Sequence, residues 1–401
     1  ERGLTNADIS FKPEQPELIL IKSKGLKTIK KEEKRVRALS RRAESCLQRG
    51  QIEEALNHVS RARRISGFER DTALLALWNE VALHDCRTGL AGTWILNRHQ
   101  MSIPVNCSIL DAHAKKVLAG HQDRKLRLWQ LNSSSSPLEF SGHKGKITCL
   151  KLLHKSDFAL SGSEDKSLKL WDLNSGECLF TFQGHDASVL SIAVDKDEHF
   201  ALSGSADKSL KLWDLKQRAL SKTLFYHTKE VHAVAIYAAG KKALSAGYDS
   251  HLVLWDLEKG KYLRTLGPID EKINSVLILP DGRFALSGGD KGSLKLWDLT
   301  KGRFLQEIEA VAGAISSMVQ SPCGRFILAG GHDKRLAFID LFQSKKINLD
   351  FEIKGRLFAL SMSEDCRFAM AQDDEGFLLF ELDWKLELKA KKEGLETLFG
   401  L

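Results

Sequence analysis

Three nearly identical stretches of this sequence show that the chain is built from internal repeats. They are "FALSGSEDKSLKLWDL" at residues 158–173, "FALSGSADKSLKLWDL" at 200–215 and "FALSGGDKGSLKLWDL" at 284–299. A tryptophan recurs every 42 residues, at Trp129, Trp171, Trp213, Trp255 and Trp297. One more step of 42 reaches Ile339 and a further 41 reaches Phe380, so the pattern predicts seven units. A fixed period of this size is typical of architectures whose single units cannot bury their own apolar faces.

Within a unit the sequence pattern indicates strands and not helices. The runs "VLSIAV", "FALSGS", "LKLWDL" and "CLFTFQ" are short and rich in branched or aromatic residues. Gly, Asp, Ser and Lys clusters separate them too often for a 3.6-residue helical period. Four strands in about 40 residues predict one propeller blade. We therefore expect a mainly β chain, a seven-bladed β-propeller of four-stranded antiparallel blades, preceded by a small α-helical hairpin region.

Two dipeptides that recur in register resemble the signature of the WD-repeat family of β-propellers. The Gly-His pairs are Gly142-His143 and Gly184-His185. The Trp-Asp pairs are Trp171-Asp172, Trp213-Asp214, Trp255-Asp256 and Trp297-Asp298. The resemblance covers about residues 93 to 384, and it is specific for the fold while saying little about function.

The resemblance also implies a hydrogen-bonded tetrad of His, Ser, Asp and Trp inside a blade. Three blades carry it with identical spacing: His143, Ser161, Asp165, Trp171; His185, Ser203, Asp207, Trp213; and His227, Ser245, Asp249, Trp255. His beside Ser and Asp is also the composition of a catalytic triad. Recurrence in three blades favours a structural role, in which buried polar atoms satisfy one another and the aspartate is the shared acceptor of His and Trp.

The other blades depart from the tetrad pattern. Asp123, Asp333 and Asp374 keep the tight-turn aspartate, whereas the fifth unit has Lys291 there and Asp290 one position earlier. Units one, five, six and seven have no histidine at the aligned position. We expect these blades to depend more on packing and to be locally less stable.

Ring closure is expected to use a strand from the N-terminal side of the propeller. Residues 92–97 resemble the segment that precedes other blades, so they should form the outer strand of blade seven, with residues 356–384 supplying its three inner strands. This arrangement leaves no strand edge unpaired. The alternative is an outer strand from "KLELKA" at 385–390.

The segment before the repeats has helical periodicity. Apolar residues recur at helical spacing at Val36, Leu39, Ala43 and Leu47, and again at Ile52, Ala55, Leu56, Val59 and Ala62. A third helix should begin after Asp71, a suitable N-cap. The first two helices resemble a tetratricopeptide-like hairpin, and the segment resembles the helical neck before propellers in large bacterial multidomain signalling proteins. The expected organisation is an extended basic linker at 1–30, a helical neck at 31–90, the propeller at 91–384 and a tail at 385–401.

Composition bounds the class of protein. The chain is 43% hydrophobic and 28% charged, with no apolar run long enough to span a membrane. Its net charge of +8 lies mostly in the first 70 residues, which lack interleaved aromatics, so a nucleic-acid partner is not favoured. Seven widely spaced cysteines without a CxxC motif indicate reduced thiols in a cytoplasmic protein and no metal site. No cofactor is predicted.

Function is expected where the repeats differ. The resemblance implies partner binding on the face formed by the tight turn of each blade and the loop before its inner strand. Just before the aligned aspartate stand Gln122, Glu164, Ala206, Tyr248, Asp290, His332 and Asp373. Just before the inner strand stand Lys146, Ser188, Glu230 and Lys272. This mixed rim favours a protein or peptide segment with some positive charge.

The leading hypothesis is a non-enzymatic scaffold or sensor that binds a protein, a peptide or upstream domains of its own polypeptide. It would be the regulatory or docking end of a larger bacterial signalling or defence protein. The alternatives are a stand-alone adaptor, and a small-ligand sensor or enzyme that uses the central channel. The inner strands offer only Cys149 and His232 as reactive groups in the stretches considered, so no enzyme activity and no catalytic residue is predicted.

Overall fold

The computed structural model describes residues 26–386, except 66–67, 69–70, 83–86, 102, 132, 134, 154–156, 238–239, 268 and 350–352. These residues divide into two compact units. One comprises the chain up to Gly92 together with residues from Asp383, and the other comprises Thr93–Leu382. The expectations for residues 1–25 and for most of the tail, 387–401, lie outside the described residues.

The larger unit contains seven four-stranded antiparallel sheets, which we number as blades along the chain. Blades one to three consist of β2 (Val105–Leu110), β3 (Lys116–His121), β4 (Leu126–Gln130), β5 (Leu138–Phe140); β6 (Ile147–Leu153), β7 (Phe158–Ser163), β8 (Leu168–Asp172), β9 (Cys178–Phe182); and β10 (Val189–Val194), β11 (Phe200–Ser205), β12 (Ser209–Asp214), β13 (Ala219–Phe225). Blades four to six consist of β14 (Val231–Ile236), β15 (Lys242–Gly247), β16 (Leu252–Asp256), β17 (Lys261–Leu266); β18 (Ile273–Ile278), β19 (Phe284–Gly289), β20 (Ser293–Asp298), β21 (Arg303–Glu309); and β22 (Ile315–Gln320), β23 (Phe326–Gly331), β24 (Leu336–Asp340), β25 (Lys345–Asn348). The fold is therefore the predicted seven-bladed propeller.

Blade seven is closed by the N-terminal strand. Its strand order is β1–β28–β27–β26, with β1 (Arg87–Gln100), β28 (Gly376–Leu386), β27 (Phe368–Asp373) and β26 (Ala359–Met362). The predicted outer strand at 92–97 lies within β1, and the alternative from residues 385–390 is wrong. Both closing strands are longer than expected, because β1 begins at Arg87 and β28 continues to Leu386.

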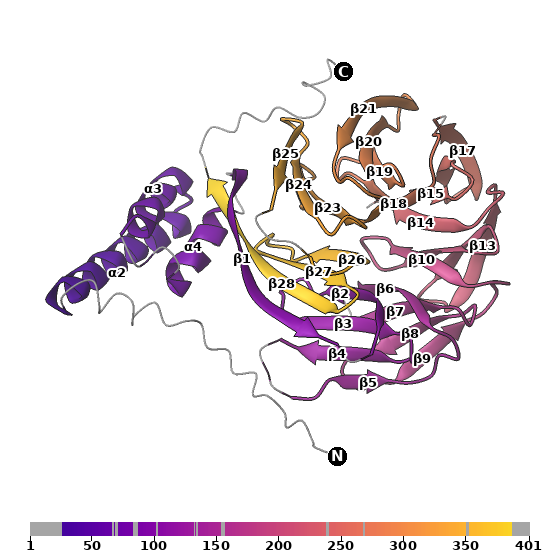
Figure 1. The fold of residues 1–401 in the computed structure, drawn as a ribbon, viewed down its shortest axis with the longest axis horizontal. Coiled ribbons are helices and arrows are strands. Elements are labelled where there is room, and N and C mark those ends of the chain that lie inside the picture. The colour runs from indigo at the N-terminus through magenta and orange to yellow at the C-terminus, as the bar shows by residue number, and fades with distance from the viewer. Residues whose placement is uncertain are drawn as a thin grey trace. The chain divides into compact units, whose positions relative to one another are not determined.

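The first strands of the blades form the inner wall of the ring. β2, β6, β10, β14, β18, β22 and β26 contact one another in that order, and β26 contacts β2 again. In Figure 1 these strands lie toward the centre of the ring, and fourth strands such as β5, β13 and β17 lie at its edge. Any channel of the propeller is thus lined by seven short segments.

The second strand of each blade is almost completely buried because both of its faces pack against neighbouring sheets. In β7, Ala159, Leu160, Ser161, Gly162 and Ser163 are all buried. A Cβ added at Gly162 would lie 2.6 Å from the sulfur of Cys149 and 2.7 Å from Val189 of the next blade. The glycine is therefore required for close packing of blade two against blade three.

The smaller unit contains three helices, α2 (Leu26–Gln48), α3 (Ile52–Arg63) and α4 (Thr72–Ala82). Most of the predicted apolar positions are buried in one core, and they are joined there by residues of α4 such as Leu74, Leu77 and Val81. Asp71 Oδ1 accepts the backbone N–H of Leu74 at 3.0 Å, as an N-cap does. Helix α2 begins within the segment expected as linker. A tetratricopeptide-like identity of these helices stays a prediction.

Residues from the end of β28 complete this helical unit. Arg63 donates two hydrogen bonds to the carboxylate of Asp383, at 3.1 and 2.9 Å, and its guanidinium lies 4.5 Å from the ring centre of Trp78. The indole N–H of Trp78 donates to the carbonyl oxygen of Trp384 at 3.2 Å. The segment expected to end the propeller therefore belongs, in its last residues, to the helical unit.

Candidate functional site

The two sets of rim residues meet through backbone hydrogen bonds. The N–H of Tyr248 donates to the carbonyl of Glu230 at 3.0 Å, and that of Asp290 donates to Lys272 at 3.2 Å. The corresponding pairs are Gln122–Pro104, Glu164–Lys146, Ala206–Ser188 and His332–Ala314. Six blades therefore present both sets on one face of the propeller, which we call the turn face.

Each of these turns needs a left-handed residue directly after the aligned aspartate position. Lys166 and Lys208 have φ of 71° and 70°, and Gly292 has φ of 79° at the same place in blade five. Arg124, Ser250 and Lys334 occupy the position in the remaining three blades, with φ between 63° and 71°. A non-glycine residue adopts this region at a cost, so the position is fixed by the turn and its side chain points out of the tight bend.

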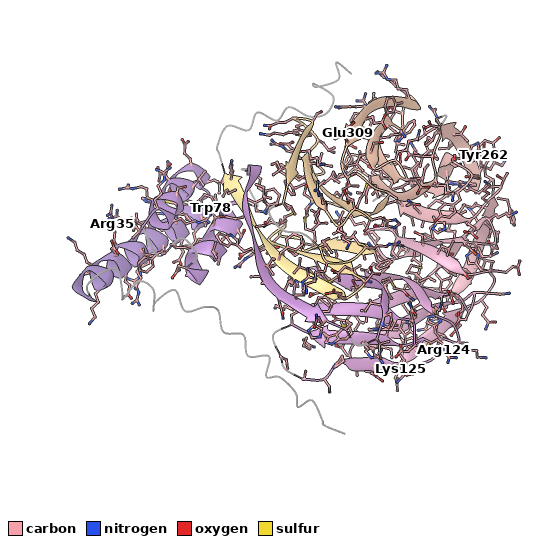
Figure 2. The ribbon with its side chains drawn as sticks, viewed as in Figure 1. Arg35, Trp78, Arg124, Lys125, Tyr262 and Glu309 are labelled. Atoms are coloured by element: carbon pink, nitrogen blue, oxygen red, sulfur yellow. The ribbon has the colours of Figure 1, made fainter. Side chains whose placement is uncertain are left out.

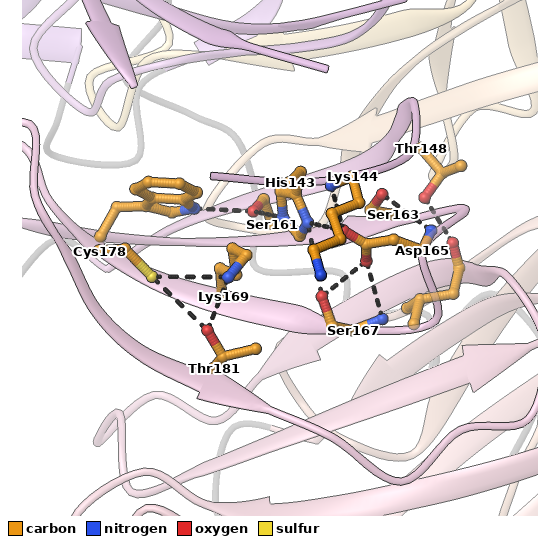
Figure 3. A network of polar contacts seen from close by, with 12 residues as sticks. His143, Lys144, Thr148, Ser161, Ser163, Asp165, Ser167, Lys169, Cys178 and Thr181 are labelled. Atoms are coloured by element: carbon orange, nitrogen blue, oxygen red, sulfur yellow. Dashed lines mark hydrogen bonds and ion pairs between the residues drawn. The ribbon is translucent and has the colours of Figure 1, made fainter. Parts of the chain in front are cut away.

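Blade two shows the tetrad in full, and Figure 3 shows its contacts. His143 Nδ1 lies 2.7 Å from Asp165 Oδ2, and His143 Nε2 lies 2.7 Å from Ser161 Oγ. The indole N–H of Trp171 donates to the same Ser161 oxygen at 2.8 Å. With Nδ1–H donated to the carboxylate, Nε2 accepts the serine O–H, so a neutral histidine satisfies every group.

Blades three and four repeat this geometry. The Nε2–Oγ distance is 2.7 Å in both blades, and the indole–Oγ distances are 2.8 and 2.7 Å. The Nδ1–carboxylate distances are 2.6 and 2.9 Å. Trp and His share the serine hydroxyl and not the aspartate, so the expected role of the aspartate as shared acceptor is wrong.

The aspartates instead connect two loops of the turn face. Asp165 Oδ2 also accepts the backbone N–H of Lys144 at 2.8 Å, and Oδ1 accepts the hydroxyl of Ser167 at 2.6 Å. Burial raises the pKa of Asp165, but the hydrogen bonds from Ser167, Lys144 and His143 outweigh it and lower the pKa to about 2. Burial lowers the pKa of His143, so its neutral form is favoured.

Blade five also joins its two turn-face loops by a hydrogen bond, but here the carboxylate lies on the preceding loop and the backbone N–H lies in the tight turn. Ile269 replaces the histidine, and the buried Glu271 on the preceding loop accepts the backbone N–H of Lys291 at 2.9 Å. Glu271 also binds the ammonium of Lys295, whose side chain is 12% exposed. A buried ion pair therefore takes the place of the histidine and the aspartate, while the indole N–H of Trp297 still donates to Ser287 Oγ at 2.9 Å. The lower stability expected for this blade stays a prediction.

Blade one likewise uses charges where a histidine is missing. Arg127 donates to Asp123 at 2.7 Å and to Glu139 at 2.9 Å. Its side chain is 10% exposed. In blades six and seven, Asp333 and Asp374 keep the bond to the loop, each accepting a backbone N–H at 2.8 Å, and Asp333 also accepts the backbone N–H of Arg335 at 3.3 Å.

Asp373, predicted for the exposed rim, does not belong to it. Its side chain is 3% exposed, and it accepts a hydrogen bond from Arg98 of β1 at 3.2 Å. It also accepts the backbone N–H groups of Glu375 and Gly376. The turn of blade seven is shorter than the others, because Asp373 pairs directly with Gly376. Its side chain therefore faces the closing strand.

Aromatic and charged side chains converge where blades four and five meet on the turn face. The rings of His232 and Tyr248 are stacked, with centroids 3.8 Å apart and planes inclined by 10°. The ammonium of Lys272 lies 4.8 Å from the centre of the Tyr248 ring. Glu230 lies 3.4 Å from His232 Nε2, and the amide of Asn274 donates to Asp290 at 3.0 Å. We call these six residues the Tyr248 cluster.

The exposed charges of the turn face are mainly basic. The exposed Lys and Arg in its described turns and loops are Arg124, Lys144, Lys146, Lys166, Lys208, Lys229, Lys272, Lys291, Lys334, Arg335, Lys354 and Arg356. The exposed Asp and Glu of the same segments are Glu164, Asp186, Glu230, Asp270, Asp290, Asp374 and Glu375. Figure 2 labels Arg124 of this set. Sequence analysis overlooked the basic position that follows the aspartate, and so its expectation of a positively charged partner does not fit this surface.

A comparison with known protein families finds a match to several of these blades. The family described as "WD domain, G-beta repeat" (WD40) matches five segments, residues 134–172, 176–214, 218–256, 260–298 and 302–340. Each match ends at a Trp-Asp pair or at Ile339-Asp340, and five of the seven blades obtain their first three strands from it. The chain therefore contains five WD40 repeats, which form part of its seven-bladed β-propeller. A comparison with curated proteins found no match to it.

The described residues contain no group of three or more His, Cys, Asp or Glu placed to hold a metal ion. The six cysteines in the described part of the chain are free thiols. Within the same part, no helix is long and apolar enough to cross a membrane.

Proposed function

We propose that the protein is a non-enzymatic interaction module that binds a segment of a partner protein on the turn face of its propeller. The observation that carries the proposal is the Tyr248 cluster. Tyrosine is among the residues that contribute most to binding at protein interfaces. Tyr248 is partly exposed and already held by His232, so binding costs little side-chain entropy.

The charge of the turn face supports an acidic partner segment. Opposite charges on two surfaces raise the rate of encounter and select against partners of the wrong charge. Lys272 beside the Tyr248 ring would pair with a carboxylate next to a residue packed on the ring. The closed ring of blades holds these groups in fixed positions, which is how a rigid scaffold recognises an extended segment.

The histidine–serine pairs support a scaffold over a hydrolase. Ser161, Ser203 and Ser245 are fully buried inside their blades, so a substrate cannot reach their hydroxyl groups. Each of these hydroxyls also accepts an indole N–H. Their chemistry is that of satisfied buried polar groups.

The proposal is tested by selecting peptides from a random display library on the purified protein and measuring their affinities. We expect selected peptides to be rich in Asp and Glu, and Tyr248→Ala to weaken binding by about tenfold or more. Tyr262→Ala is the matched control. Tyr262 is 55% exposed on β17 (Figure 2) and pairs with Trp255, at the end of the strand away from the tight turn. Equal loss in both variants, or peptides without acidic residues, would contradict the proposal.

The wider context is part of the same proposal. The likeness of the helical segment to the neck of large bacterial signalling proteins supports a regulatory or docking role within a longer cytoplasmic polypeptide. The intact mass of the natural protein, measured from its own cells, tests this point. A mass far above 44.8 kDa supports it, whereas a mass near that value makes the protein a stand-alone adaptor.

A further inference from the structure

Inner strands of the propeller line a cavity that is open to solvent and includes none of the rim residues of the turn face. Its volume is about 310 Å³, and β2, β6, β10, β22 and β26 contribute its lining. This volume is at the lower end of the range for small-molecule sites. The question is which chemistry its walls would accept.

The cavity contains one unpaired positive charge. Lys151 of β6 lines it, and no Asp or Glu is among the described residues that form its wall. Lys151 makes no ion pair with any residue in the described part of the chain. Burial lowers the pKa of Lys151, and no carboxylate opposes this effect. Lys151 is partly buried, and an anion in the cavity would give its ammonium a partner that the described residues do not supply.

Three serine hydroxyl groups in the wall of the cavity have hydrogen atoms to donate. Ser108 is 7% exposed, and its buried Oγ has no hydrogen-bond partner. Ser191 and Ser317 each use the oxygen to accept a backbone N–H, at 3.2 and 3.0 Å. Their O–H groups have no acceptor among the described residues. All three serines line the same cavity as Lys151.

The two thiols of the cavity wall, Cys107 and Cys149, do not bring a negative charge to it. Burial raises the pKa of Cys149 to about 12 and that of Cys107 well above its usual value, so both are neutral at pH 7. The wall therefore offers one cation, several hydroxyl donors and no negative charge. These are the groups that bind a carboxylate or a phosphate.

We propose that the channel of the propeller is a binding site for a small oxyanion, held by the Lys151 ammonium and the hydroxyls of Ser108, Ser191 and Ser317. The inference is independent of the partner segment on the turn face. A small anion held by these four residues would contact the inner strands of four blades, β2, β6, β10 and β22. It would stabilise the folded ring, because only the folded state brings these strands together.

The experiment measures thermal unfolding in inorganic phosphate, acetate and citrate, against sodium chloride at equal ionic strength and pH. We expect at least one of the three oxyanions to give a saturable rise in Tm of at least about 2 °C. The response should disappear in Lys151→Met and weaken in Ser108→Ala. Lys166→Met, which removes an exposed lysine from the same blade, is the matched control and should keep the response. A response to phosphate indicates a phosphate site, whereas a response to acetate or citrate indicates a carboxylate site.

Lys151→Met also separates a ligand site from a structural role. Without oxyanion we expect this variant to be at least as stable as the original protein, because the half-buried Lys151 makes no ion pair with a described residue. A lysine needed for folding would instead destabilise the protein when replaced. The proposal is overturned if no oxyanion raises Tm in a saturable way, if Lys151→Met responds as the original protein does, or if Lys151→Met lowers Tm in chloride.

Discussion

Replacing Asp165 by asparagine tests how the tight turn of blade two is held. The carboxylate accepts hydrogen bonds from His143, from the Lys144 backbone and from Ser167. An amide of the same size keeps one acceptor oxygen but loses the negative charge. We expect Asp165→Asn to fold and to be less stable at pH 7.

The pKa of Asp165 gives the size of the effect. A pKa of about 2, against 3.8 for an unperturbed aspartate, corresponds to about 2.4 kcal/mol of preference for the ionised form in the folded state. The side chain is 11% exposed, so solvent screening reduces this value and we expect about 2 kcal/mol. Because the pKa is lowered on folding, this stability is present above about pH 4 and is lost as pH falls toward 2.

The assay is urea denaturation followed by tryptophan fluorescence at pH 7 and pH 3. The difference in the free energy of unfolding between the original protein and Asp165→Asn should fall by about half at pH 3, since part of the carboxylate stabilisation is then lost. Glu164→Gln is the matched control, because it removes the same charge from the exposed neighbouring residue. It should change stability by less than about 0.5 kcal/mol.

Two results would refute this reasoning about Asp165. One is an unfolding free energy at pH 7 that is the same in Asp165→Asn and in the original protein. The other is a loss that is as large at pH 3 as at pH 7, because the effect would then not depend on the carboxylate charge. Either result would mean that the loops of the turn face are held by packing.

Two further substitutions test the networks inside blades three and five. Ser203→Ala should reduce the unfolding free energy by about 2–4 kcal/mol in urea denaturation, because the indole of Trp213 and Nε2 of His185 both lose their partner in a fully buried site; a loss below about 1 kcal/mol would contradict it. Lys295→Met should cost about 3 kcal/mol, because Glu271 is left as a buried charge without its ammonium partner. Lys295→Arg should restore part of this loss, and equal stability of the two variants would speak against the ion pair.

The architecture could be predicted because each blade has the same packing requirements, and these recur at a fixed spacing along the sequence. The 42-residue spacing of the tryptophans places the four strands of each unit. The same spacing places blade one, where Trp129 lies in β4 although the blade has no tetrad histidine. Ring closure was also readable, since the segment within β1 resembles the strand that precedes each other blade. A strand pattern that recurs six times predicts its seventh copy.

What sequence analysis missed are substitutions that keep an interaction while changing its position. Glu271 replaces the tight-turn carboxylate from the opposite loop, so aligned columns show only a missing histidine and a lysine. Asp373 lies in a shortened turn, and a column count cannot show that its side chain faces Arg98. Long side chains reach the same atoms from different backbone positions, and only coordinates show which of them do so.

Lys151 is a different kind of omission, because its signal was present in the sequence. The equivalent positions of β10, β14 and β18 are Ala193, Ala235 and Leu277, so a lysine in this column is out of place among apolar residues. An internal repeat allows each column to be compared without any relatives, and a single charged residue in an apolar column indicates a local requirement that packing does not impose.

The offset between the sequence repeat and the structural blade explains why differences between repeats can accumulate on one face. Each matched segment begins at the outer strand of one blade and ends at the third strand of the next, so every repeat covalently joins two neighbouring sheets. The residues that join them, such as Gly162 against Val189, cannot vary without opening the ring. Turn residues such as Tyr248 and Lys272 meet across neighbouring blades at the partly exposed turn face, outside the buried packing, and can differ from blade to blade. The inner strands are also packed against neighbouring blades, and only their atoms that face the channel make no such contact. Specific recognition in this propeller is therefore expected at those two places, and both the Tyr248 cluster and Lys151 lie there.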